Sequence, residues 1–134
     1  MLERIDELMQ QGTDFAFETT LATKSHASRI KCAKKQGYLV TLLFFWLRDV
    51  KLAEERVKIR VSEGGHNIPQ AIIQRRYLAG IRNFFNIYLP VCDNIILLDN
   101  SGNTPNFVMQ QVAGEPPIIL DPDLYRQIKL TANE

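Results

Sequence analysis

The sequence predicts an α/β domain built on a parallel sheet. Two stretches, residues 38–46 and 94–99, are almost wholly apolar, as strands covered on both faces must be. Segments whose apolar residues recur at helical spacing alternate with these stretches. Strands that alternate with helices are typical of parallel α/β sheets. No internal repeat or low-complexity linker interrupts the 134 residues, so we expect a single domain over residues 1–134.

The first third of the chain predicts helix, strand, helix and strand in that order. A helical pattern starts at Met1 and ends at Gly12, and a short buried strand follows at Phe15–Thr19. We expect the next helix over 25–36, closed by Gly37, before the long apolar strand 38–46. The chain begins inside a helical pattern with no capping residue before it. This favours a chain shortened at its start.

The remaining elements follow from caps and breakers. Asp49 is a suitable N-cap for a helix that ends at the Gly-Gly of 64–69, and Pro69 opens a long helix that reaches about Leu89. Strand 94–99 ends in an Asn-Ser-Gly turn. Residues 107–112 and 118–120 predict a peripheral hairpin, and a last helix starts at 121–122.

Composition bounds the class of protein. A net charge of +1, with 46% hydrophobic and 23% charged residues, is typical of a soluble globular protein. The two cysteines, Cys32 and Cys92, lack metal-ligand spacing, which favours free thiols in a reducing cytosol. The longest apolar run is too short to cross a bilayer, and the charged, helical N-terminus does not resemble a secretory signal. We therefore expect a cytoplasmic protein without membrane contact.

Two carboxylates are expected at the carboxyl ends of strands, where ligands bind in open α/β sheets. Glu18 is followed by Thr19 and Thr20, which together offer an acceptor for a hydroxyl or metal-bound water and two hydroxyls for phosphate or sugar. Asp99, with Asn100, ends the second strand. The alternative is that both acids stabilise turns. This alternative is favoured for Asp99, whereas for Glu18 the two interpretations are equally supported.

Basic residues gather on the two helices around the Gly-Gly loop. Between residues 56 and 82 there are six of them and one acid, Glu63; the six are Arg56, Lys58, Arg60, Arg75, Arg76 and Arg82. Arginines on a hinged helical hairpin suit a lid that stabilises a transferring phosphoryl group. The alternative is a basic helix surface that simply faces solvent. Without a family resemblance, the residues favour this alternative over a lid. His66 in the loop is a weak candidate for contact with phosphate or base.

Two further observations limit the functional classes. A second basic stretch lies between Lys24 and Lys35 without recognisable nucleic-acid modules, so a solvated helix face is the better interpretation and a nucleic-acid function ranks last. No Gly-x-x-x-x-Gly-Lys-Ser/Thr motif occurs in the sequence, so the 134 residues contain no loop of the type that binds the phosphates of ATP in P-loop proteins.

Several short motifs, taken in their order along the chain, resemble those of the zeta-toxin-like P-loop kinases, in particular the bacterial branch known as "predicted ABC-type ATPases". The resemblance covers residues 1–102. Its most specific part is Arg60-Val-x-x-Gly-Gly-His-Asn-Ile-Pro69 followed by Arg75-Arg-Tyr77. Further matching words are Phe17-Glu-Thr-Thr-Leu21, Gly37-Tyr38, Leu42–Leu47, Leu52-Ala-x-x-Arg-Val57, Asn83-Phe84 and Asp99-Asn-Ser-Gly102.

The resemblance implies a three-layer kinase-type parallel sheet with a helical lid over about 49–89. It also implies phosphoryl transfer from ATP, with Mg²⁺, to a hydroxyl-bearing small molecule such as a nucleotide-linked amino sugar. Glu18 is similar to the family's acid on the acceptor and magnesium side, with Thr19 and Thr20 beside it. Arg60, Arg75 and Arg76 resemble lid arginines, while His66, Asp99 and Asn100 are nucleotide-side candidates. At most one of the adjacent Arg75 and Arg76 faces the site well.

The family's first strand, phosphate loop and catalytic Asp precede the segment that matches this chain. We therefore expect a shortened kinase-type domain that is inactive alone. The competing interpretation is a non-catalytic remnant or interaction module, for example a dimer that pairs its bare strand edges. An antitoxin partner and the role of residues 103–134 are left open by the sequence.

Overall fold

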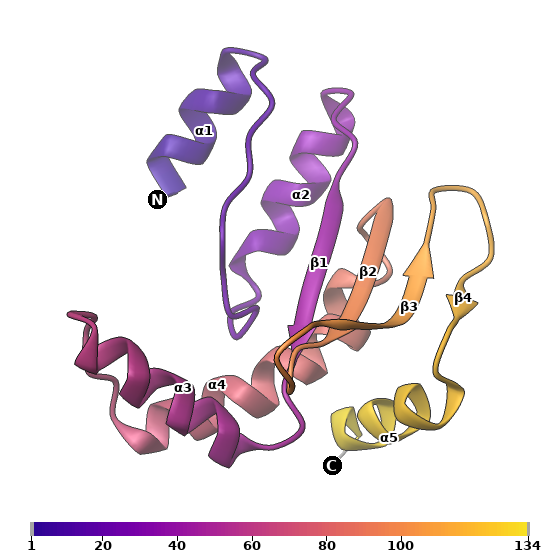
Figure 1. Ribbon diagram of the computed structural model, residues 1–134. Helices are drawn as coiled ribbons and strands as arrows, with labels where there is room; N and C mark the ends of the chain where they lie inside the picture. The colour runs from indigo at the N-terminus through magenta and orange to yellow at the C-terminus, as the bar shows by residue number, and fades with distance from the viewer. Residues whose placement is uncertain (1, 134) are drawn as a thin grey trace.

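Five α-helices, one π-helical segment and four strands make up the described chain (Figure 1). The computed structural model describes residues 2–133, without the side chain of Leu2; Met1 therefore lies outside the described residues. The helices are α1 (Leu2–Gln10), α2 (Ser25–Lys35), α3 (Val50–Ser62), α4 (Gln70–Asn83), η1 (Phe84–Tyr88) and α5 (Pro122–Ala132). The strands are β1 (Thr41–Trp46), β2 (Asn94–Asp99), β3 (Asn106–Gln111) and β4 (Ile118–Ile119).

Local sequence signals set the helix ends. The Asp49 carboxylate accepts the main-chain N–H of Leu52 at 2.8 Å and so caps α3, as predicted. Asp121 caps α5 in the same way through Leu124, at 3.1 Å. After α2 the chain reverses at Gly37, whose φ of +93° favours glycine. The helix that Pro69 opens continues through α4 into η1, which confirms the long helix.

The sheet has the order β1-β2-β3-β4 and is mixed. β1 and β2 are parallel, with Trp46 opposite Asp99, whereas β2–β3 and β3–β4 are antiparallel. The α/β class is confirmed, and one strand pair is parallel. The excursion expected to be peripheral is part of the main sheet, because β3 pairs along β2 and contributes buried Val108 and Met109 to the core.

The prediction of a strand at Phe15–Thr19 is wrong. Residues 13–20 form no strand and pair with none of the described strands. The two aromatic side chains of this segment pack on other side chains instead: Phe15 lies edge-on to Tyr38 at 5.9 Å between ring centroids, and Phe17 lies 5.1 Å from the His26 ring. Apolar content alone therefore does not predict whether this segment pairs with the sheet.

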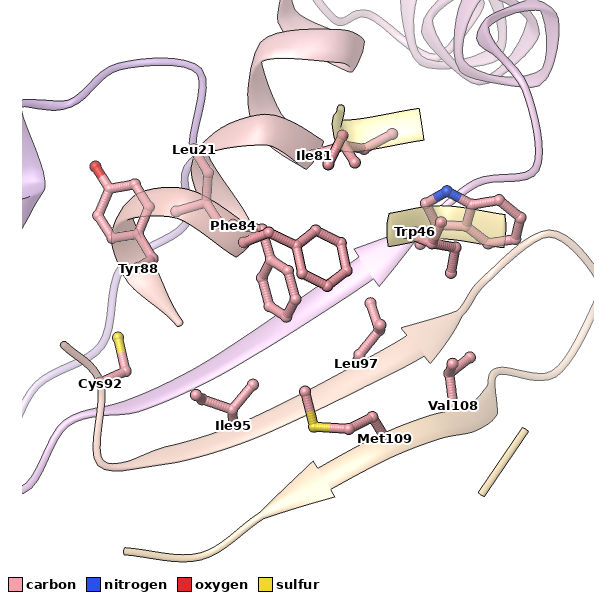
Figure 2. Packing of buried hydrophobic residues seen from close by; sticks show 13 residues of the cluster. Leu21, Trp46, Ile81, Phe84, Tyr88, Cys92, Ile95, Leu97, Val108 and Met109 are labelled. Carbon is pink, nitrogen blue, oxygen red and sulfur yellow. The ribbon is translucent and has the colours of Figure 1, made fainter. Parts of the chain in front are cut away.

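The core lies between the helices and one face of the sheet (Figure 2). Ile95 and Leu97 of β2 point to this face and are fully buried. Phe44 of β1 stacks on Phe84 of η1 with 4.8 Å between ring centroids, and Ile128 of α5 completes the layer. Burial of these large side chains fixes the helices on the sheet.

The other face of the sheet is uncovered in the part of the chain that the structure describes. Leu43 and Phe45 of β1 are 51% and 50% exposed, and Phe107 of β3 and Ile118 of β4 are similarly exposed. The expectation that 38–46 is covered on both faces is therefore wrong for β1, whereas β2 is mostly buried. An apolar run indicates that both faces of a strand can be buried, but it does not ensure that another element packs against each face.

Candidate functional site

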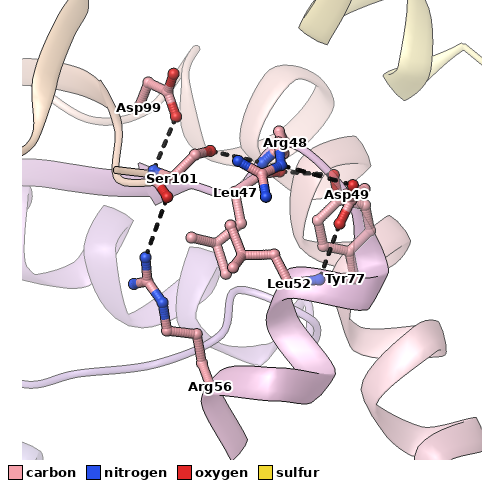
Figure 3. A network of polar contacts seen from close by, with 8 residues as sticks. All are labelled: Leu47, Arg48, Asp49, Leu52, Arg56, Tyr77, Asp99 and Ser101. Carbon is pink, nitrogen blue, oxygen red and sulfur yellow. Dashed lines mark hydrogen bonds and ion pairs between the residues drawn. The ribbon is translucent and has the colours of Figure 1, made fainter. Parts of the chain in front are cut away.

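The carboxyl ends of the two parallel strands meet at one edge, which is the usual ligand side of an α/β sheet (Figure 3). The main-chain N–H of Asn100 donates to the Trp46 carbonyl at 2.8 Å. The N–H of Arg48 donates to Ser101 Oγ at 2.9 Å. The turns that follow β1 and β2 are thus held together at this edge.

Asp99 serves its own turn. Its Oδ1 accepts the main-chain N–H of Ser101 at 3.0 Å, which is the role that the sequence favoured for it. Asn100 contributes its main chain, through the bond to Trp46 and through its carbonyl. Both side chains are partly exposed at the edge.

The two helices of the predicted lid are tied to this edge by Arg56 and Tyr77, to which the sequence analysis assigned no role in a site. Nη2 of Arg56 on α3 donates to the carbonyls of Asn100 at 2.9 Å and Ser101 at 3.4 Å. The Tyr77 hydroxyl on α4 donates to the Leu47 carbonyl at 2.7 Å. Burial, assisted by the Asp49 charge, raises the pKa of Tyr77 to about 12, so this donor keeps its proton at neutral pH.

Glu18, Thr19 and Thr20 lie in an exposed segment that leads into a tight turn, rather than at a strand end. Thr19 Oγ1 accepts the N–H of Leu21 at 3.2 Å, and Thr20 Oγ1 accepts the N–H of Ala22 at 3.3 Å. Each hydroxyl uses one lone pair in this way and retains its own proton for donation. The turn places Leu21 at a φ of +60° with its side chain buried.

Helix α4 and η1 clamp this turn. Nδ2 of Asn83, itself buried, donates to the Leu21 carbonyl at 2.7 Å, and the Tyr88 hydroxyl donates to the Thr23 carbonyl at 2.6 Å. At Gly80 a Cβ would lie only 2.6 Å from the Thr20 carbonyl oxygen, so the close approach requires glycine. A buried Asn and a Gly within an apolar helical stripe were the available sequence signals for this contact.

The predicted lid arginines are exposed. Arg60 lies in the last turn of α3, and Arg75 and Arg76 lie on α4. Within residues 2–133, none of these three guanidinium groups makes a hydrogen bond or an ion pair. His66 is exposed in the loop between the helices. That loop closes through the Gly65 N–H, which donates to the Arg60 carbonyl at 2.7 Å.

Helix periodicity separates the adjacent Arg75 and Arg76. Residues three and four apart share a helix face. Arg76 is therefore on the face of Gly80 and Asn83, which contacts the Glu18–Thr20 turn. Arg75 is turned about 100° away from that face. Arg60 shares a face of α3 with Arg56, one turn farther from the edge of the sheet.

A largely apolar cavity of about 190 Å³ lies between β1 and residues 15–19, with walls from α1 and α2. His26, 5% exposed, is part of its wall, and burial together with the Arg29 charge lowers its pKa. Cys92 also lines the cavity, and burial and the Asp93 charge raise the pKa of its thiol to about 11. Both side chains are therefore neutral at pH 7.

The fold and this site define an α/β protein with a helical hairpin, α3–α4, fastened to the carboxyl edge of its parallel strands. The family model for zeta toxin matches residues 1–107, so the chain belongs to the zeta toxin family. It is also 36% identical over 69 residues to an uncharacterized protein of Haemophilus influenzae, an alignment that covers 52% of this chain and 49% of that protein. The match thus spans about half the length of this relative. No solved structure matches the chain significantly.

Membrane-spanning helices and clusters of metal ligands are both absent from the described residues. None of the helices in residues 2–133 is long and apolar enough to span a membrane. No group of three or more His, Cys, Asp or Glu side chains in the same residues could hold a metal ion. Glu18, which the resemblance predicts on the magnesium side, therefore does not belong to such a group.

Proposed function

We propose that this chain carries the acceptor-binding turn and the lid of an ATP-dependent small-molecule kinase of the zeta toxin type. The observation that supports this proposal best is the contact between the Glu18–Thr20 turn and the face of α4 that bears Arg76. The turn carries an acid and two hydroxyls, and the helix face carries a cation that is unpaired within residues 2–133; groups of these kinds can bind a phosphorylated or hydroxylated ligand. Family membership over residues 1–107 supports the same function.

Each group has a chemical role in the proposal. The Glu18 carboxylate accepts a hydrogen bond from the acceptor hydroxyl and orients it. The hydroxyls of Thr19 and Thr20, whose lone pairs already accept main-chain N–H groups, donate to anionic oxygens. Arg76 stabilises negative charge on the transferring group, and Arg60 approaches from α3 when the hairpin closes. Arg56 and Tyr77 hold the base of the lid, residues 49–89, on the sheet.

The described residues do not by themselves fit ATP with Mg²⁺. The sequence has no phosphate loop of the Gly-x-x-x-x-Gly-Lys-Ser/Thr type, and residues 2–133 have no metal-binding cluster. We therefore propose that the 134-residue chain alone turns over no ATP. His66, Asp99 and Asn100 remain nucleotide-side candidates, with Asp99 already engaged in its turn.

Binding of the acceptor tests the proposal without requiring turnover. In an NMR titration with a nucleotide-linked amino sugar, we expect shifts at the amides of Thr19 and Thr20. Arg76→Ala should weaken this binding at least tenfold, because a charge-assisted hydrogen bond contributes about 1.5–3 kcal/mol. The matched control is Arg75→Ala, which removes the neighbouring guanidinium, about 100° away around the helix. Equal effects of the two substitutions, or shifts remote from the turn, would contradict the assignment.

The second candidate is a non-catalytic interaction module that associates with itself or with an antitoxin. The specific observation in its favour is the exposed apolar face of the sheet, with Leu43, Phe45 and Phe107 each at least half exposed. Sedimentation equilibrium from 5 to 500 µM tests self-association. A dimer that dissociates in the Phe45→Lys variant would favour the module, whereas a monomer throughout would count against it.

A further inference from the structure

A polar pocket lies between the chain that leads into α2 and one face of the helix formed by α4 and η1. Its volume is about 390 Å³, which is within the range of about 300–1,000 Å³ typical of small-molecule sites. One wall contains Ala22 and Lys24, just before α2. The other wall is a helix face whose residues recur three and four positions apart, among them Ala79, Arg82, Asn83 and Asn86.

Two hydrogen bonds join the two walls of this pocket. Nδ2 of Asn83 donates to the carbonyl of Leu21, the residue before Ala22, at 2.7 Å. The Tyr88 hydroxyl donates to the carbonyl of Thr23, the residue before Lys24, at 2.6 Å. The fold therefore sets the spacing of the walls before any ligand is present, and a preformed site loses less conformational freedom on binding.

The charge of the pocket is positive. Lys24 and Arg82 are cations, and none of the described residues that line the pocket is an Asp or a Glu. Within residues 2–133 the Lys24 ammonium makes no hydrogen bond or ion pair. The Arg82 guanidinium has five N–H donors, so it can bind a ligand in addition to a contact elsewhere. Two positive charges match the charge of about −1.5 to −2 on a phosphate monoester at pH 7.

The uncharged part of the lining indicates the rest of the ligand. The exposed Asn86 side chain has both donors and an acceptor, which suit hydroxyl groups. Ala22, Ala79 and Ile87 add apolar surface on which C–H groups can pack. A volume of about 390 Å³ lies near the lower end of the range for ligand sites. These features favour one sugar-sized unit with several hydroxyl groups over a dinucleotide.

We propose that this pocket binds a small phosphorylated sugar or polyol, whose phosphate is bound by Lys24 and Arg82 and whose hydroxyl groups contact Asn86. The lining includes neither the Glu18–Thr20 turn nor Arg76, so the inference does not rest on the proposed kinase function. The pocket and the turn are neighbours, because Asn83 lines the pocket and also holds the turn through Leu21.

Glucose 6-phosphate is the probe, and gluconate and glucose are the matched controls, because they keep the carbon chain but carry one negative charge or none. The measurement is an NMR titration of the 134-residue chain. We expect saturable shifts at the main-chain amides of Ala22 and Lys24 and at the side-chain amide of Asn86. Glucose 6-phosphate should bind at least tenfold more tightly than gluconate. Its affinity should fall as the pH drops below about 6, where the phosphate gains a proton.

Four variants locate the binding. Lys24→Gln should weaken the binding of glucose 6-phosphate about tenfold, because a hydrogen bond to a charged group is lost. Its matched control is Lys31→Gln, which changes the net charge equally at an exposed position of α2 outside the lining. Ala79→Leu fills the pocket from the helix wall with a residue of similar helix propensity and should abolish saturable binding. Arg76→Ala, at the neighbouring turn, should leave the affinity for glucose 6-phosphate unchanged.

Four results would overturn the inference. Equal affinities for glucose 6-phosphate and gluconate would show that the pocket does not select phosphate. Equal losses in Lys24→Gln and Lys31→Gln, or binding that survives Ala79→Leu, would place the binding outside the pocket. A loss in Arg76→Ala as large as that in Lys24→Gln would assign the ligand to the acceptor turn. Absence of glucose 6-phosphate binding, in a protein whose Thr19 and Thr20 amides respond to the nucleotide-linked amino sugar, would refute this pocket and leave the proposed function standing.

Discussion

Gly80→Ala tests the contact between α4 and the Glu18–Thr20 turn. Within a helix this substitution normally stabilises a protein by about 1 kcal/mol, because alanine has the higher helix propensity. Here the new Cβ would lie 2.6 Å from the Thr20 carbonyl oxygen, whereas ordinary contact begins at 3.4 Å. Helix and turn must therefore separate by roughly 0.8 Å, and the contacting atom is main chain, which cannot rotate away.

The separation has a calculable consequence at the neighbouring hydrogen bond. Asn83 Nδ2 lies 2.7 Å from the Leu21 carbonyl oxygen. A shift of roughly 0.8 Å lengthens this bond to the limit of hydrogen bonding and leaves two buried polar groups poorly satisfied, at a cost of about 1–3 kcal/mol. We therefore expect Gly80→Ala to lower the free energy of unfolding by about 1 kcal/mol net, the opposite sign from a typical helical Gly→Ala.

Urea denaturation measures the change, and amide exchange of residues 19–23 locates it. Gly102→Ala is the matched control, because a Cβ at Gly102 meets no atom within 4 Å. If the loss acts through Asn83, then Asn83→Ala should cost less in the Gly80→Ala background than in the unchanged protein. Stabilisation of about 1 kcal/mol by Gly80→Ala would refute the reasoning, since it would mean that the close approach does not exist in solution.

Four further predictions follow from other contacts. Asn83→Ala alone leaves a buried carbonyl without a donor and should lower the free energy of unfolding by about 1–3 kcal/mol in urea, against no more than 0.5 kcal/mol for the exposed Asn86→Ala. Tyr77→Phe should cost about 1 kcal/mol in the same assay, and absorbance at 295 nm should show that this hydroxyl titrates near pH 12. Because His26 has a lowered pKa in the folded state, the unfolded chain binds its proton first. Stability should therefore fall as the pH drops below about 6.5, by up to about 1.4 kcal/mol per pH unit, and His26→Gln should remove this dependence. A thiol reagent at pH 8 should modify exposed Cys32 but reach buried Cys92, with its pKa of about 11, only after unfolding; rapid reaction of both would contradict the burial.

Local signals in the sequence fixed most helices. The caps Asp49 and Asp121 and the terminator Gly37 act within one helical turn, so their effect can be read without knowledge of the fold. The strands 94–99 and 41–46 were equally predictable, because long apolar runs between turn signals admit few alternatives. The role of Asp99 in its turn is of the same local kind.

Long-range packing decided the rest. Residues 13–20 have a strand-like composition, yet whether they pair depends on a neighbour at β1 that no local pattern specifies. The exposure of Leu43 and Phe45 likewise depends on whether another element packs on their face of the sheet, which their own sequence does not specify.

By itself the sequence determined the class of fold, its helix boundaries and the residue types at the candidate site. Only the tertiary structure placed the Glu18–Thr20 turn against α4, showed that Arg76 rather than Arg75 shares the helix face of that contact, and tied Arg56 to the sheet edge. The physical reason is the range of the interactions. Caps and periodicity act over three or four residues, whereas the bond from Asn83 to Leu21 joins positions 62 apart in the chain and exists only after the helix has packed.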